Sequence, residues 1–215
     1  MGISMSFKVV MICAASKEKS SSLIFNNQEI SFQASSNRVN NIYLPDDKIS
    51  ITGSETWRDF ITNNQQQIPF KAYELYRRDE YRQLYDSYRD SFYILSAGWG
   101  LVNSEFRLPR YDITFLNKNQ ETFRNNKVNN YEDFNQLILK PHDEIIFIGT
   151  EKYLPLFFNL TDKIINKKII YWRAMGTILN YPLPNETFEY RKYVTNTRTL
   201  WHYELAKKNA SGEIS

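Results

Sequence analysis

The sequence predicts a single α/β domain with a mostly parallel central sheet flanked by helices. Four short apolar runs rich in β-branched residues recur along the chain, each suited to a strand buried on both faces. Helical or polar tracts separate these runs, as parallel strands require. With 215 residues, the chain can bury a substantial core without disulfides. The predicted strands are FKVVMIC at 7–13, FYILS at 92–96, EIIFI at 144–148 and KIIYW at 168–172.

The tracts between these strands predict the remaining elements. Residues 23–55 alternate apolar and polar side chains between Asn, Asp and Gly breaks, which predicts a small β insertion, an antiparallel hairpin or meander. A helix is expected to begin near Ser54 and Thr56, a second to cover 70–89, where tyrosines form one face, and a short third to cover 152–159. The domain is predicted to span 1–208, followed by a flexible tail at 209–215.

Composition narrows the function classes. A net charge of +3, from 27 basic and 24 acidic residues, does not by itself indicate a nucleic-acid partner. The 15 Tyr, 14 Phe and 4 Trp suit either base stacking or a filled core. A single Cys and two distant His argue against a disulfide framework and a zinc site. The chain has no secretory signal and no 18-residue apolar run, so a cytoplasmic protein is expected.

Small or polar residues follow all four predicted strands. In open α/β sheets, ligands bind at the carboxyl ends of the strands. The pattern therefore favours one shared pocket, although loops select such residues in any case. The segments concerned are Cys13 to Ser16, Ser96 to Gly100, Gly149 with Thr150, and residues 173–176.

Two residues beyond the second strand could carry chemistry. Asp112 could stabilise a cationic sugar in a transition state, and it could equally cap a turn. Trp99, between Gly98 and Gly100, could stack on a nucleobase or fold back onto the core. The loop that contains Ser16 and Lys17 could bind an anion or be simply solvated, and Arg107 and Arg110 lie near Asp112 in the sequence.

The order of motifs resembles a known superfamily. The matching segments are Cys13-Ala14-Ala15-Ser16-Lys17, Ala72-Tyr73-Glu74-Leu75-Tyr76, ILSAGWGLV at 94–102, Pro109-Arg110-Tyr111-Asp112 and Gly149-Thr150-Glu151-Lys152-Tyr153. This order resembles the DUF6884-like domains and, more distantly, the YaaA-type peroxide-stress proteins. It is also similar to the uracil-DNA-glycosylase-like domain of archaeosine tRNA-modifying enzymes. The YaaA-type pattern has Arg in place of Asp112, and the family has Ser directly after Cys, whereas Ala14 and Ala15 intervene here.

The resemblance implies a uracil-DNA-glycosylase-like fold and a monofunctional DNA glycosylase that excises a modified base in defence against phages. Asp112 would be the catalytic carboxylate, facing the same cavity as Trp99, and neither metal nor cofactor would be needed. The implied base-binding residues are Cys13, Ser96, Ala97, Gly98, Trp99, Gly100, Tyr111, Gly149, Thr150 and Tyr153. DNA phosphates would contact Ser16, Lys17, Arg107 and Arg110.

Two other functions stay open. One is a non-catalytic, YaaA-like DNA-binding stress protein. The other is a metal-dependent nuclease of the PD-(D/E)xK kind, built from Asp112, Glu144 and Lys152.

Overall fold

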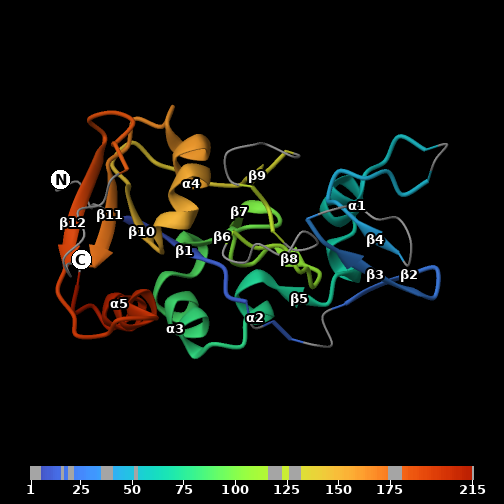
Figure 1. The fold of residues 1–215 in the computed structure, drawn as a ribbon, viewed down its shortest axis with the longest axis horizontal. Helices are drawn as coiled ribbons and strands as arrows, with labels where there is room; N and C mark the ends of the chain where they lie inside the picture. Colours follow the sequence, from blue (N-terminus) through green and yellow to red (C-terminus); the bar gives the residue numbers. More distant parts are fainter. Residues whose placement is uncertain are drawn as a thin grey trace.

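A seven-stranded, mostly parallel sheet forms the centre of the protein (Figure 1). The computed structural model describes residues 6–15, 17–18, 22–34, 41–50, 53–115, 123–125, 132–173 and 181–214. Neighbouring strands are parallel except for β6 and β7. In sheet order, the strands are β12 (Phe188–Tyr193), β11 (Lys168–Arg173), β10 (Glu144–Ile148), β1 (Phe7–Ile12), β6 (Phe92–Ser96), β7 (Gly100–Asn103) and β9 (Phe134–Asn135).

The α/β prediction and its four strands are confirmed, as β1, β6, β10 and β11. All five residues of β6 are buried, and so are the last four of β1 and of β10. Helices cover both faces of the sheet and explain this burial. In Figure 1, α4 (Leu154–Thr161) lies on one face, and α3 (Asp79–Tyr88) and α5 (Trp201–Ala210) lie on the other.

Within the insertion expected at 23–55, the described residues 23–34 and 41–43 form a small separate sheet beside the β7–β9 edge (Figure 1). Strand β2 (Leu23–Phe25) pairs antiparallel with β3 (Gln28–Phe32) through Asn26 and Asn27, which both have positive φ, as tight hairpin turns require. The predicted antiparallel pattern stops there, because β4 (Ile42–Tyr43) pairs with β3 in parallel. The expected helix follows as α1 (Trp57–Asn63) and the short η2 (Gln65–Gln67), with a capping box between Thr56 and Asp59.

The single helix expected over 70–89 is wrong. The tract divides into β5 (Phe70–Lys71), α2 (Ala72–Leu75) and α3, followed by η3 (Arg89–Ser91). Strand β5 pairs with β8 (Arg107–Leu108), and Tyr76 forms a β-bridge with Lys17. These long-range backbone bonds compete with helical ones and break the helix.

The C-terminal part contains elements that the sequence analysis missed. The expected short helix is divided into η4 (Glu151–Tyr153) and α4. Strand β12 and helix α5 follow, and α5 extends to Ala210, two residues into the tail expected at 209–215. Asn209 is 1% exposed, and its side-chain amide donates to the Ile214 carbonyl.

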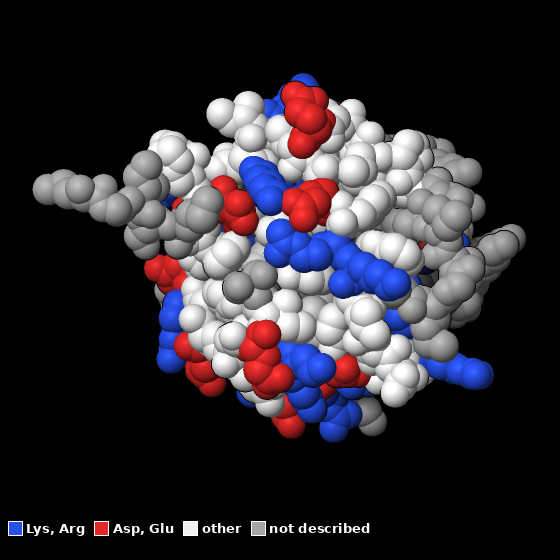
Figure 2. All heavy atoms as spheres, turned by 90° about the vertical axis from the view of Figure 1, so that its left-hand side faces the viewer, with Lys and Arg blue, Asp and Glu red and all other residues white. Residues whose placement is uncertain are grey.

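Strand β12 forms an edge of the central sheet, and its side chains are strongly charged. Glu189 pairs with Lys167 at 2.7 Å and with Arg191 at 3.2 Å. Figure 2, which views the molecule from this side, shows cationic and anionic side chains close together. Mixed charges of this kind discourage pairing with the edge of another sheet.

Gly100 begins β7 with a φ of +86°, a left-handed conformation that favours glycine. A Cβ at this position would lie 2.5 Å from the Phe134 carbonyl oxygen. The turn between β6 and β7 is thus pressed directly onto the backbone of β9.

We expect Gly100→Ala to lower the free energy of unfolding by about 2 to 4 kcal/mol, from backbone strain and overpacking. Gly53→Ala is the matched control, since its Cβ would lie 3.5 Å from Ser50 Cβ at ordinary contact distance. Urea denaturation measures both. Equal midpoints for the two variants would contradict this account of the turn.

His202 lies in α5 and is 7% exposed. Burial lowers its pKa to about 4, and the nearby Arg78 acts in the same direction. The neutral imidazole is therefore favoured in the folded state. As the pH falls from about 6.5 towards 4, the unfolded chain takes up a proton that the folded chain does not, and stability is lost.

This titration should cost about 2 kcal/mol of stability between pH 7.5 and pH 5. His202→Gln should remove that part of the pH dependence. The other histidine, His142, is exposed, so His142→Gln should leave the wild-type dependence in place. Urea denaturation of the three proteins at both pH values tests this. A His202→Gln protein with the full wild-type dependence would refute the assignment.

Candidate functional site

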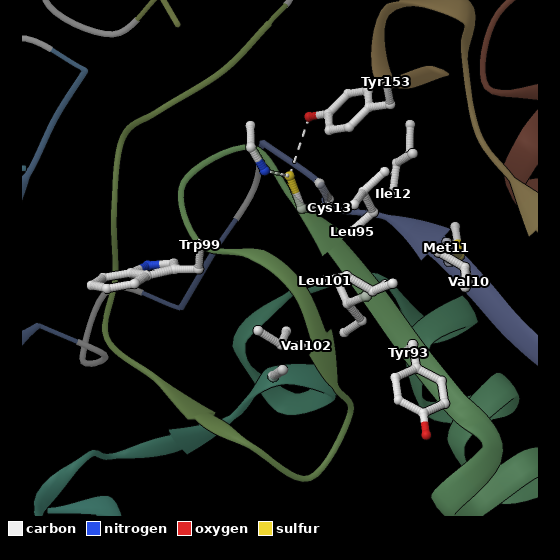
Figure 3. Close-up of a cluster of buried hydrophobic side chains, with 14 of the residues drawn as sticks. Val10, Met11, Ile12, Cys13, Tyr93, Leu95, Trp99, Leu101, Val102 and Tyr153 are labelled. Atoms are coloured by element: carbon white, nitrogen blue, oxygen red, sulfur yellow. Dashed lines mark hydrogen bonds between the residues drawn. The ribbon is translucent and has the colours of Figure 1, made fainter. Parts of the chain in front are cut away.

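The carboxyl ends of β1, β6 and β10 meet around Cys13. Its sulfur lies 3.2 Å from the Tyr153 hydroxyl and accepts from the Ala97 amide at 3.4 Å. Figure 3 shows Cys13 between the ends of β1 and β6, with the Tyr153 ring reaching towards it. Cys13 is 7% exposed and Tyr153 is 2% exposed. This part of the expected site is therefore closed.

The Ser96 hydroxyl connects the turn after β6 to Tyr111. It accepts from the amides of Gly98 at 3.1 Å and Trp99 at 3.0 Å, and it donates to the Tyr111 hydroxyl at 2.8 Å. The Tyr111 hydroxyl also lies 2.7 Å from that of Tyr76. Burial holds the pKa of both tyrosines well above its usual range, so these phenols stay neutral and act as hydrogen-bonding groups.

Asp112 is exposed, immediately after the buried Tyr111. Its amide donates to the Phe32 carbonyl at 2.8 Å, and it forms a β-bridge with Gln33. Asp112 does not cap a helix; it borders a pocket of about 260 Å³ between the small sheet and the segment that follows β8. The pocket is lined by Ser22, Glu29, Ile30, Ser31, Gln33, Arg110, Tyr111 and Asp112.

The insertion thus supplies one wall of the pocket, and its contributors were missed as site residues. Glu29, Ser31 and Gln33 carry no motif and lie about 80 residues before Asp112 in the sequence. Their alternating pattern predicts a strand, but nothing local indicates which strand or loop faces it. Only the folded structure shows that the end of β3 pairs with the backbone of Asp112.

Two cations lie near this pocket. Arg110 is exposed and lines it, whereas Lys17 is half-buried with its Nζ 4.1 Å from the centre of the Tyr111 ring. Burial lowers the pKa of Lys17; Cys13 and Asp112 act in the opposite direction, and Arg110 adds to the lowering. Ser16, which was also expected to contact a phosphate, lies outside the described residues.

Arg107, which was also expected to contact a phosphate, holds neighbouring backbone in place. Its Nη1 donates to the carbonyls of Ile68 at 3.0 Å and Pro69 at 2.9 Å. Its backbone also exchanges hydrogen bonds with the Gln65 side chain. These bonds hold the segment before β5 against β8.

The expectation that Trp99 and Asp112 face one cavity is wrong. Trp99 is 1% exposed and does not line the pocket that Asp112 borders. Its ring centre lies 5.0 Å from that of Phe32 and 6.2 Å from that of Phe134. In Figure 3, Trp99 points away from Cys13 and Tyr153. The Gly100 turn folds Trp99 back into the core, where it packs the insertion against the sheet.

Four further predicted base-binding residues, all in the turn after β6 or next to it, lie in the interior. Ser96, Ala97, Gly98 and Gly100 are buried. A Cβ on Gly98 would lie 2.7 Å from the Tyr111 ring, so glycine there allows the ring to pack on the turn.

Gly149 and Thr150 lie apart from Asp112. They line a small cavity of about 20 Å³ between β10, β11 and α5. The Thr150 hydroxyl is buried and has no hydrogen-bond partner within the described ranges. The structure therefore does not join these two residues and Asp112 in one pocket.

A buried ion pair that the sequence did not predict also holds the turn after β6. Arg124 forms two bonds with Asp133, of 2.7 and 2.8 Å, and donates to the Ala97 carbonyl at 3.1 Å. Their side chains are 2% and 5% exposed. Nothing in a nine-residue spacing between loop residues signals such a pair.

The arrangement expected for a metal-dependent nuclease is not formed. Glu144 begins β10, at the amino end of the sheet, while the neighbours of Asp112 lie at the carboxyl ends of the strands. Among the side chains that the structure describes, no three of the types His, Cys, Asp and Glu gather as metal ligands would.

Comparison of the chain with family models, curated proteins and solved structures finds no match. Function must therefore be argued from the site itself. Within the described part of the chain, no helix has the length and apolar character needed to cross a membrane.

Tyr111→Phe should cost about 1 to 3 kcal/mol of stability, because the buried hydroxyls of Ser96 and Tyr76 each lose a partner. Tyr43→Phe is the control, since no hydrogen bond is formed by the Tyr43 hydroxyl among the described residues. Urea denaturation compares the two. Equal stability of both variants would show that the hydroxyl network does not hold the site.

Proposed function

We propose that this protein is a DNA glycosylase that flips a modified base out of DNA and excises it, leaving an abasic site. The observation that carries the proposal is the exposed carboxylate of Asp112 on a polar pocket, beside Arg110. The resemblance of the Pro109 to Asp112 motif to DUF6884-like and uracil-DNA-glycosylase-like domains favours this chemistry. Defence against phages whose DNA carries modified bases is the biological role that we infer.

The chemistry requires one well-placed negative charge. The N-glycosidic bond breaks through an oxocarbenium-like state, and a carboxylate can stabilise that cation and orient the attacking water. Asp112 is suited to this because no ion pair engages its side chain within the described ranges. Its backbone is fixed by the bond to Phe32, which keeps the carboxylate at the pocket.

The pocket suits a single base. Its volume of about 260 Å³ is below the range of roughly 300–1,000 Å³ typical of sites for drug-sized ligands. The polar side chains of Ser31, Gln33 and Glu29 could bond the edges of a flipped base, which is how such enzymes read their target. Arg110 and Lys17 would contact the flanking phosphate.

A non-catalytic DNA-binding protein is the second candidate. The observation that favours it is the burial of Trp99 and of the Tyr111 ring, which leaves neither as an open stacking wall for a base. In that case Arg110 and Asp112 would serve recognition alone. Measuring binding and base release on the same DNA separates the two functions.

The test incubates the protein with unmodified DNA and with phage DNAs that carry modified bases, and then counts abasic sites with an aldehyde-reactive probe. We expect abasic sites on a modified DNA, and Asp112→Asn should release the base about 100-fold or more slowly, because it removes the stabilising charge. Asp90→Asn, an exposed carboxylate beside the start of β6, should act as wild type.

Binding without abasic sites on any of these DNAs would support the second candidate and overturn the glycosylase. Undiminished release by Asp112→Asn would remove Asp112 from the mechanism.

A further inference from the structure

The amine of Lys17 is held close to the pocket by its backbone. Lys17 forms a β-bridge with Tyr76, and the next amide, of Glu18, donates to the Leu75 carbonyl at 2.9 Å. These bonds direct the side chain over the Tyr111 ring, with Nζ 4.1 Å from the ring centre. The same tyrosine lines the pocket that Asp112 borders, so the amine lies next to a residue of the pocket wall.

Lys17 differs from Lys168, another lysine whose pKa is lowered by burial. Lys168 is fully buried, and its Nζ donates to the Thr187 hydroxyl at 2.7 Å and to the Ile164 carbonyl. Within the described part of the chain, Lys17 has neither an acceptor nor an ion-pair partner at hydrogen-bond distance; it contacts aromatic rings instead. Lys168 therefore has a structural role, whereas the amine of Lys17 remains available for chemistry.

The surroundings of Lys17 also favour its neutral form. Burial lowers its pKa, and the cation of Arg110 acts in the same direction, although Cys13 and Asp112 oppose both. Enzymes activate lysine nucleophiles by desolvation and by a neighbouring cation, because only the neutral amine has a lone pair to donate. A partly accessible lysine that lies over an aromatic ring and has its pKa lowered by burial and by Arg110 fits this pattern.

We propose that Lys17 is a nucleophile that forms a Schiff base with the aldehyde of an abasic deoxyribose, giving the protein a second, strand-cleaving activity. The substrate class is the product of base removal, so the inference rests on the proposed glycosylase for its biological supply of substrate. It does not need that activity in a test, because abasic DNA can be prepared beforehand.

The reaction balances without an oxidant or a cofactor. The lone pair of Nζ attacks C1′ of the ring-opened sugar, and loss of water from the carbinolamine, with uptake of one proton from solvent, gives a protonated imine. A base, for which Asp112 is placed, removes a proton from C2′, and the electron pair forms the C2′–C3′ double bond as the C3′–O bond breaks. The 3′ phosphate leaves with the bonding electrons, and hydrolysis of the imine then restores Lys17.

The experiment uses the full chain and a duplex with one preformed abasic site, treated with sodium borohydride. Hydride from borohydride reduces the imine to a stable secondary amine, which joins protein to DNA. We expect a covalent adduct on a denaturing gel with wild type, and peptide mapping should place it on Lys17. Omitting borohydride should instead give a cleaved strand.

The variants distinguish nucleophile from phosphate contact. Lys17→Arg keeps the positive charge but lacks the amine, and it should lose the adduct while still binding the duplex. Lys17→Ala should lose it too. Lys48→Ala, which changes an exposed lysine in the same half of the chain, should form the adduct as wild type.

The proposal is overturned if wild type binds the abasic duplex without forming an adduct, or if Lys17→Arg forms it undiminished. An adduct mapped to another lysine would overturn it as well. Base release is measured separately on intact modified DNA. Adduct formation without base release would therefore refute only the proposed glycosylase activity. Base release without an adduct would refute only the proposed Schiff base.

Discussion

The candidate site depends on the hydrogen bonds of the Ser96 hydroxyl. This hydroxyl accepts from two amides of the turn after β6 and donates to Tyr111, so one oxygen fixes both the turn and the residue beside Asp112. Ser96 is fully buried, where a lost hydrogen bond costs the whole desolvation of its partner groups. The exposed carboxylate is positioned by a rigid interior, which is what a catalytic group requires.

Interior and rim have separate roles. The hydroxyls of Tyr76, Tyr111 and Tyr153 are buried, and burial holds the pKa of each well above its usual range. They form a neutral network that orients residues and does not transfer protons near neutral pH. The charged side chains of Asp112 and Arg110 lie outside that network, on the pocket.

The sequence predicted what local patterns determine. The four central strands were correct because continuous apolar runs are typical of strands buried on both faces. The break in the helix at Tyr76 was missed because its cause, the bridge to Lys17, joins residues almost 60 positions apart. The fate of Trp99 was equally hidden, since Phe32 and Phe134 come from two distant segments.

Phe32 shows why the pocket wall could not be predicted. Its ring packs against Trp99, and its carbonyl accepts the amide of Asp112. One residue of β3 thus couples the buried side of the turn to the exposed carboxylate. The pocket is composite, because strand β3 of the insertion and the segment around Asp112 each supply only one wall. If the insertion lost its packing on Trp99, Asp112 would lose both its backbone anchor and the facing wall, while the central sheet would keep its own core.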